Sequence, residues 1–193
     1  MEVRNIDDRD LIVAYLDGND FAFEVLLNRH RDKIYTSIYL FVKDQSQADD
    51  IFQEVFIKIV DTLRRGKYNH EGKFVQWAMR IAYNLCVDHF RRNKRRPIVH
   101  AKEDFDIFDV LKSTDANGED LVIRSQTHAK VRELVDQLPP EQREVVILRH
   151  YADMSFKEIA TLTRVSINTA LGRMRYALIN IRKMIAQQDV VLQ

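Results

Sequence analysis

Apolar side chains recur every three or four residues along most of the first half of the chain, which is the spacing of one face of an α-helix. The pattern predicts three successive helices. Asn19 or Asp20 is the expected N-cap of the first, Ser46 is that of the second, and the third is expected to start near Lys73. Their inner stripes are predicted to be Phe23, Leu26, Leu27, Ile34, Ile38 and Phe41; then Ala48, Ile51, Phe52, Val55, Phe56, Ile59, Val60 and Leu63; then Phe74, Trp77, Ala78, Ile81, Ala82, Leu85 and Cys86.

Acidic residues stand at the start of the second predicted helix. Asp49 and Asp50 fall in its expected first turn, where the partial positive charge of a helix N-terminus favours carboxylates. With Gln53 and Glu54 they form a polar face beside the apolar stripe. This position is enough to explain the two aspartates, so no paired-carboxylate catalysis is inferred from them.

The helical pattern is interrupted after the third predicted helix. Residues 97–122 begin at Pro97, include the sequence STDANGED and have an excess of acidic side chains, which is typical of a linker. Further along, Pro139 and Pro140 stand where a helix would begin, a place where a missing N–H is harmless. The 5 Gly and 3 Pro in 193 residues are few for sheets joined by tight turns. We therefore expect an all-α protein with two small helical domains, residues 1–96 and 123–193, joined by this linker.

The C-terminal domain contains the pattern of a helix-turn-helix. Ser155 and Glu158 have the spacing of a capping box at the start of a short helix, and Ser166 is the expected N-cap of a longer one. No Asp or Glu occurs between Glu158 and Asp189, although the 30 Lys and Arg of the whole chain nearly balance its 29 Asp and Glu. Such a helix suits a DNA groove lined by phosphates, although a solvated basic helix is the plainer alternative. The expected base contacts come from Ser166, Asn168, Thr169 and Arg173, and the phosphate contacts from Arg175, Arg182 and Lys183.

A second basic block follows the third predicted helix, where the sequence reads RRNKRR at residues 91–96. On the face of that helix opposite the core we expect Gln76, Arg80, Tyr83, Asn84 and Arg91. Aromatic rings beside cations suit single-stranded nucleic acid, because bases stack on the rings while cations follow the backbone. Trp77 and Tyr68 are the candidate stacking groups, with a place in the core as the alternative for Trp77.

Other features of the sequence limit the possible functions. Cys86, the single cysteine, cannot form an intramolecular disulfide and is expected to be buried and inert. The six His residues lack ligand spacing, so neither a metal site nor a cofactor is expected. There is no long apolar run and no secretion signal at the N-terminus, so we expect no membrane span and a cytoplasmic location.

Four ordered segments resemble successive conserved regions of a bacterial extracytoplasmic-function sigma factor of the sigma-70 superfamily. They read GNDFAFEVLLNRH, QADDIFQEVFIKI, KFVQWAMRIAYNLCVDHFRR and LPPEQREVVILRHYADMSFKEIATLTRVS. The resemblance covers most of residues 10–185 apart from the linker. It implies a non-enzymatic protein that binds core RNA polymerase, recognises promoter DNA and helps to open it, with an anti-sigma factor as a further partner.

The resemblance also implies roles for particular residues. Asp49, Asp50, Gln53 and Glu54 would dock on the clamp of the β′ subunit of the polymerase. The −10 element would be held by Tyr68, Lys73, Trp77, Arg80, Asn84, Arg91 and Arg92. The −35 element would be bound by Ser166, Asn168, Thr169, Arg173, Arg175 and Arg182, and the acidic linker would run toward the RNA exit path.

Three residues depart from the family's usual pattern. Arg164 stands in the turn where Gly is common, while Leu171 and Gly172 stand where Lys and Ser are frequent. These departures affect the expected −35 sequence rather than the helix-turn-helix itself. The alternative function is a helix-turn-helix repressor or activator with an N-terminal sensing or dimerisation domain, but it leaves the acidic docking helix and the second basic block unexplained.

Overall fold

The computed structural model describes residues 6–69, 71–93 and 130–187, and all regular secondary structure in these ranges is helical. The chain divides into two compact units, of which α1 to α4 form the first and α6 to α8 belong to the second. Residues 94–129 lie outside the described ranges, so the predicted acidic linker and the exact domain boundaries remain predictions. None of the described helices is long and apolar enough to cross a membrane.

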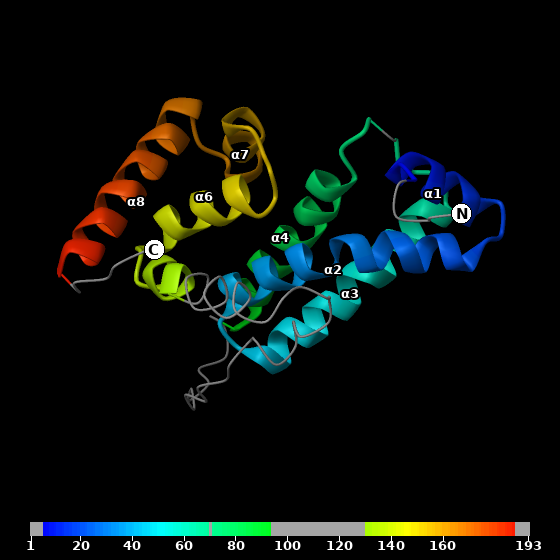
Figure 1. Cartoon of the computed structure of the whole chain (residues 1–193), viewed down its shortest axis with the longest axis horizontal. Coiled ribbons are helices and arrows are strands. Elements are labelled where there is room, and N and C mark those ends of the chain that lie inside the picture. The colour runs from blue at the N-terminus through cyan, green and yellow to red at the C-terminus, as the bar shows by residue number, and fades with distance from the viewer. Residues whose placement is uncertain (1–5, 70, 94–129, 188–193) are drawn as a thin grey trace, which may run out of the picture. The chain divides into compact units, whose positions relative to one another are not determined.

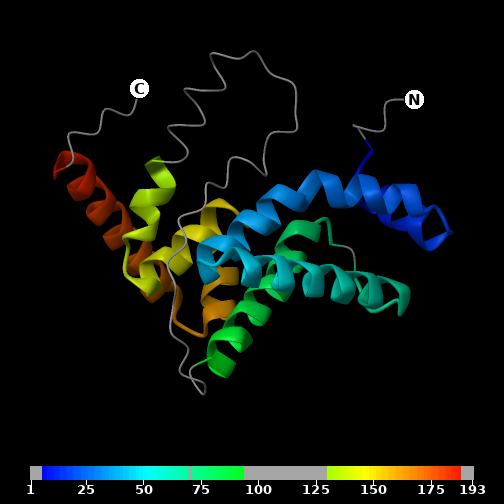
Figure 2. The same ribbon diagram turned by 90° about the horizontal axis from the view of Figure 1, so that it is seen from below.

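The first unit consists of α1 (Asp8–Leu16), α2 (Asp20–Val42), α3 (Gln45–Arg64) and α4 (Phe74–Asn93). Helices α2, α3 and α4 all pack on one another, and α1 packs on α2 (Figures 1 and 2). Most residues of the predicted inner stripes form this core, and Leu26 and Val55 are fully buried, whereas others such as Leu27, Phe56 and Ile81 are only half-buried. The hydrophobic periodicity therefore predicted three of the four helices correctly.

Helix α1 was not predicted. It is short, and its inward residues Leu11, Ile12 and Tyr15 have the spacing of a single helical face. Tyr15 packs on Phe23 of α2 with the ring centroids 4.8 Å apart, and its hydroxyl accepts a hydrogen bond from Arg64 Nε at 3.0 Å. The spacing was the available signal, but two turns are too few to separate it from chance.

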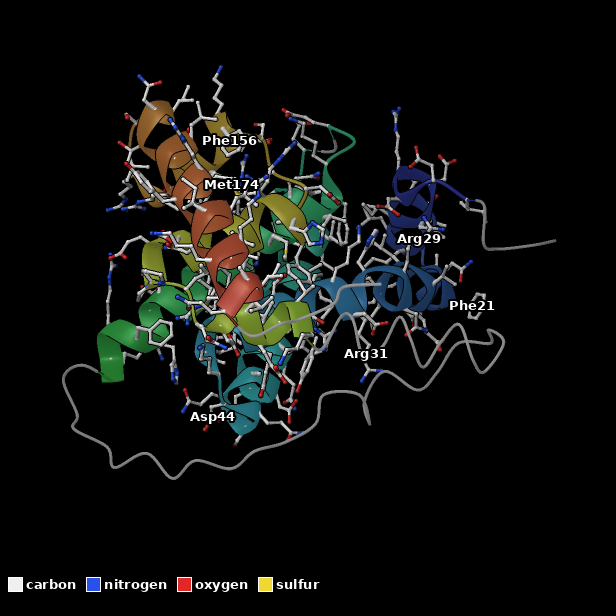
Figure 3. The ribbon with its side chains drawn as sticks, turned by 60° about the vertical axis from the view of Figure 1, so that its left-hand side comes forward. Phe21, Arg29, Arg31, Asp44, Phe156 and Met174 are labelled. Atoms are coloured by element: carbon white, nitrogen blue, oxygen red, sulfur yellow. The ribbon has the colours of Figure 1, made fainter. Side chains whose placement is uncertain are left out.

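The second unit contains α6 (Pro140–His150), α7 (Phe156–Thr163) and α8 (Ile167–Gln187), and residues 130–136 are also helical. As predicted, Pro140 is the first residue of a helix. A core of Val135, Leu138, Val146 and Ala177 is covered by Met174 (Figure 3), Ile181 and Met184 of α8. The inner stripe of α8 therefore runs from Ala170 through Met174 and Ala177 to Met184, leaving the other side of the helix outside this core.

Candidate nucleic-acid and polymerase-binding surfaces

The start of α3 differs from the prediction. Its N-cap is Asp44 (Figure 3), whose carboxylate accepts a hydrogen bond from the Gln47 N–H at 2.8 Å, so the prediction of Ser46 as the cap was wrong. Because the helix begins at Gln45, its first turn holds no acidic residue, and the placement of Asp49 and Asp50 there was also wrong. The carboxylates of these two residues are therefore not explained by capping.

The polar face of α3 is nevertheless formed as expected, with exposed Asp49, Asp50 and Gln53 and with Glu54 half-buried beside Lys58, whose Nζ lies 3.3 Å from the Glu54 carboxylate. Asp49 differs from its neighbours because it accepts a hydrogen bond from the Tyr35 hydroxyl at 2.8 Å. Burial of Tyr35, together with the adjacent Asp49 carboxylate, raises the pKa of the Tyr35 hydroxyl.

Ile57 lies on this same polar face and was missed by the sequence analysis. Its side chain is 68% exposed, although the Ile51, Val55 and Ile59 side chains of the same helix are buried. At about 100° per residue, it lies within about 20° of Asp50 around the helix axis. The signal was present in the sequence as an apolar residue that falls outside the inner stripe.

An aromatic cluster precedes and begins α4. The Tyr68 and Trp77 ring centroids are 4.4 Å apart, and Phe74 lies 6.2 Å from Tyr68 and 5.8 Å from Trp77. Phe74 is buried, whereas Tyr68 and Trp77 are half-buried, so each of these two keeps part of its ring at the surface. Burial, then the Asp8 and Glu71 carboxylates, raise the pKa of Tyr68 to about 12, so the phenol is neutral and its ring apolar at physiological pH.

The remaining predicted −10 residues mostly share one side of α4. Trp77, Arg80, Asn84 and Arg91 lie within about 60° of one another around the helix axis. Lys73, Arg80, Asn84, Arg91 and Arg92 are all exposed, and Arg91 lies 3.6 Å from the Asp88 carboxylate. Four of the predicted residues thus lie along one side of α4, at whose start Trp77 belongs to the aromatic cluster, while Arg92 lies to one side and Lys73 just precedes the helix.

Tyr83 does not belong to this face, contrary to the sequence prediction. Its side chain is 8% exposed and meets Phe41 of α2 edge-on, with the centroids 5.7 Å apart. Cys86 is 1% exposed, which confirms that the thiol is buried, and this burial raises its pKa to about 12. Among the described residues no group of His, Cys, Asp or Glu is arranged to hold a metal ion.

A polar network that the sequence analysis also missed contacts the aromatic cluster at Phe74. Asp8 of α1 accepts a hydrogen bond from Arg29 Nη1 at 2.7 Å and lies 2.8 Å from His30 Nε2 (Figure 3 labels Arg29). The His30 ring packs on Phe74 with the centroids 5.5 Å apart. Burial opposes ionisation of Asp8, but His30 and then Arg29 outweigh it, so the pKa of this carboxyl lies below its usual value. The network connects α1 to the first residue of α4.

The second unit confirms the predicted helix-turn-helix. Ser155 and Glu158 form a complete capping box at the start of α7. Arg164 ends that helix in the left-handed conformation, with φ 58°, which costs a non-Gly residue about 1 kcal/mol. Ser166 Oγ then accepts a hydrogen bond from the Thr169 N–H at 3.0 Å and caps α8. The turn keeps its geometry even though Arg replaces the common Gly.

The predicted −35 residues do not all lie on one face of α8. Asn168, Arg175 and Arg182 are exposed and lie within about 40° of one another around the helix axis. Arg173 lies about 160° from Arg175 around the axis, and its Nη1 is 3.4 Å from the Glu144 carboxylate of α6. Ser166 and Thr169 are exposed, with their hydroxyl oxygens 2.8 Å apart. The structure therefore separates Arg173 from the other predicted cations.

Comparison with known proteins agrees with this arrangement. Residues 26–96 match the family model of Sigma-70 region 2, and residues 128–175 match that of Sigma-70, region 4. The chain is 30% identical over 171 residues to the RNA polymerase sigma-H factor of Pseudomonas aeruginosa, covering 86% of this chain and 87% of that protein. It is 29% identical over 169 residues to the ECF RNA polymerase sigma factor SigE of Mycolicibacterium smegmatis, covering 87% of this chain and 63% of that protein.

A solved structure shows the same fold. The sigma factor RpoE of Bartonella quintana, crystallised with the anti-sigma factor NepR, matches with a TM-score of 0.62 at 14% identity. The match covers 85% of this chain and 96% of that one. The order of the two family regions and the extent of the sequence match together identify the protein. The chain belongs to the extracytoplasmic-function sigma factors of the sigma-70 family.

Proposed function

We propose that this sigma factor docks on core RNA polymerase with α3, holds the opened −10 element on α4 and binds the −35 element with α8. Sigma factors are non-enzymatic initiation factors that give the polymerase its promoter specificity, and the chain contains both sigma regions in order. That order is the observation that carries the proposal. A repressor or activator with a helix-turn-helix needs only the second region.

The polar face of α3 is the proposed contact with the β′ clamp. Asp50, Gln53 and Glu54 surround the exposed Ile57, so an apolar side chain stands within a polar rim. This is the usual anatomy of an energetically important contact, in which polar neighbours exclude water from an apolar anchor. Asp49 is assigned a smaller role because its carboxylate already accepts a hydrogen bond from the Tyr35 hydroxyl.

The aromatic cluster and the outer side of α4 form the proposed −10 site. The partly exposed rings of Tyr68 and Trp77 offer stacking surfaces, and Arg80 and Arg91 lie on the same side of the helix to meet phosphates. Asn84 lies between these two cations and has an amide that can hydrogen-bond an unpaired base. Lys73 and Arg92 extend the positive charge at the two ends.

The exposed side of α8 is the proposed −35 site. Asn168 and Arg175 have the side chains that pair with adenine and guanine edges in the major groove. Arg182 and Lys183, further along the helix, are assigned to phosphates, and Ser166 and Thr169 hold the helix start. The ion pair with Glu144 favours Arg175 over Arg173 as the cation that reaches the bases.

A regulatory partner and a location follow from the same assignment. The Bartonella sigma factor of similar fold was crystallised with an anti-sigma factor. We infer that this chain is likewise held by an anti-sigma factor in the cytoplasm, where it competes with core polymerase. A candidate anti-sigma protein should displace the chain from the polymerase in a concentration-dependent way, and one that binds without displacing it would contradict this inference.

Size-exclusion chromatography of purified chain with core RNA polymerase tests the proposed docking. We expect a one-to-one complex that survives gel filtration and that binds promoter DNA only when both components are present. If the chain binds promoter DNA alone and never co-elutes with polymerase, the alternative of an ordinary helix-turn-helix regulator is favoured.

A further inference from the structure

An exposed apolar side chain lies on α8 between its core stripe and its outer side. Leu171 is 43% exposed, and at about 100° per residue it lies within about 60° of both Asn168 and Arg175. The core stripe of Ala170, Met174 and Ala177 lies about 60° to 120° from Leu171 around the same axis. Leu171 is therefore placed among the residues proposed to face DNA rather than among those that stabilise the fold.

The neighbouring polar side chains either pair with another residue of the protein or cap the start of the helix. Arg173 pairs with Glu144, and the side chains of these two residues are only 25% and 22% exposed. The Ser166 hydroxyl caps the helix and lies 2.8 Å from that of Thr169. In the first two turns of α8, Asn168 and Leu171 are thus two adjacent exposed side chains available to DNA, with Arg175 one turn further on.

Gly172 leaves space next to Leu171. A Cβ atom built at this glycine would meet no heavy atom within 4 Å apart from those of its chain neighbours and the adjacent helix backbone. A glycine in a helix interior is normally unfavourable by up to about 1 kcal/mol relative to alanine. Here the absence of a side chain allows a base edge or a sugar to approach the backbone beside the leucine.

The major groove of B-DNA presents one strongly apolar group to such a surface, the 5-methyl group of thymine. We propose that Leu171 contacts this methyl group at one thymine of the −35 element, flanked by the bases that Asn168 and Arg175 contact. This inference rests on the proposed function of α8 as the −35 helix. It makes Leu171, which replaces the family's frequent Lys, a determinant of promoter specificity.

Replacement of thymine by deoxyuridine removes only the methyl group and therefore tests the contact directly. Promoters selected by the reconstituted holoenzyme are resynthesised with a single deoxyuridine at each −35 thymine in turn, and equilibrium binding is measured by competition. We expect binding to the wild-type holoenzyme to weaken about three- to fivefold at one position, as removal of one buried methyl group predicts. Leu171→Ala should bind the thymine and deoxyuridine promoters equally at that position.

Leu178→Ala is the matched control, since Leu178 is 44% exposed and lies two turns further along α8. It should keep the full discrimination, and circular dichroism should show both variants folded. The inference is overturned if no deoxyuridine weakens wild-type binding, if the selected element contains no thymine, or if Leu171→Ala still discriminates. A holoenzyme that selects a −35 sequence but ignores the methyl group contradicts this inference alone, whereas failure to select any promoter contradicts the proposed function.

Discussion

Asp49 and Asp50 are adjacent acidic residues in the sequence, but the structure gives them different surroundings. Both are exposed, but Asp49 accepts a hydrogen bond from the Tyr35 hydroxyl, whereas Asp50 lies on the side of α3 that carries Ile57. A change at Asp49 would disturb the contact between α2 and α3 as well as any partner. Asp50 and Glu54 are therefore the better residues for testing the docking face without altering the fold.

The double variant Asp50→Lys/Glu54→Lys should bind core polymerase about tenfold more weakly, with a larger loss at low salt, because charges at the rim of an interface act through steering and complementarity. Affinity is measured by fluorescence titration alongside circular dichroism. Asp17→Lys/Glu24→Lys makes the same change in net charge at two exposed positions, the residue that follows α1 and a residue of α2, and serves as the control. Normal binding by a folded docking-face variant would refute the assignment of α3.

Asn84 provides a residue-scale test of the −10 site, because its side chain is exposed and its removal leaves the aromatic cluster intact. We expect Asn84→Ala to form closed complexes normally but to give fewer opened ones, since its proposed partner is an unpaired base. Permanganate footprinting of the melted region measures opening, and Asn28→Ala, on an exposed site of α2, is the control. Equal footprints for wild type and Asn84→Ala would show that Asn84 has no role in opening.

At the scale of elements, the start of α3 offers two residues whose side chains can cap a helix, Asp44 and Ser46, and mutation distinguishes them. Asp44→Ala should lower the free energy of unfolding by about 1 kcal/mol, because it removes the acceptor for the Gln47 N–H. Ser46→Ala should change it by much less, since Ser46 lies inside the first turn. Urea unfolding of the two variants measures the difference, and the reverse order would place the helix start at Ser46.

Helix α1 is attached to the rest of its unit through Asp8, and this attachment predicts a pH dependence. The folded-state pKa of Asp8 lies below its unfolded value of about 3.9, so the carboxylate stabilises the fold above that pH. The stabilisation is lost as the pH falls below about 4 and the carboxyl becomes protonated. Asp8→Asn, which imitates the protonated form, should therefore destabilise the protein by about 1–2 kcal/mol at pH 7.

Urea unfolding of wild type and Asp8→Asn at pH 7 and pH 3 measures this contribution, with exposed Asp10→Asn on the same helix as the control. The difference between wild type and Asp8→Asn should shrink at pH 3, while Asp10→Asn should have little effect at either pH. An Asp8→Asn effect of the same size at both values would mean that the charge of Asp8 contributes nothing to stability.

The elements also show which features were predictable from the sequence. Long apolar stripes predicted α2, α3 and α4, and local capping patterns predicted the turn between α7 and α8, because each depends on residues close together in the chain. The errors arose from contacts between distant residues or from competing local choices. Tyr83 is buried by Phe41 of another helix, Arg173 is paired with Glu144 across the unit, and Asp44 rather than Ser46 caps α3.

At the scale of the whole molecule, the two units have different proposed roles. The first carries the polymerase face on α3 and the aromatic cluster beside α4, and the second carries the DNA-facing side of α8. Each unit has its own hydrophobic core, so a variant on one surface is expected to leave the other unit folded. On the proposed assignment of the −10 element to the first unit and the −35 element to the second, promoter specificity requires both units in one chain.

Mapping of transcript 5′ ends tests this account most directly. Core polymerase is given a genomic DNA library with or without the chain, and the RNA that is initiated is sequenced. We predict a new set of start sites that share one −10 and one −35 sequence at a fixed spacing and that are used less when the Asp50→Lys/Glu54→Lys variant is supplied at the same limiting concentration. Start sites that are unchanged by the chain, or that share no upstream sequence, would contradict its function as a sigma factor.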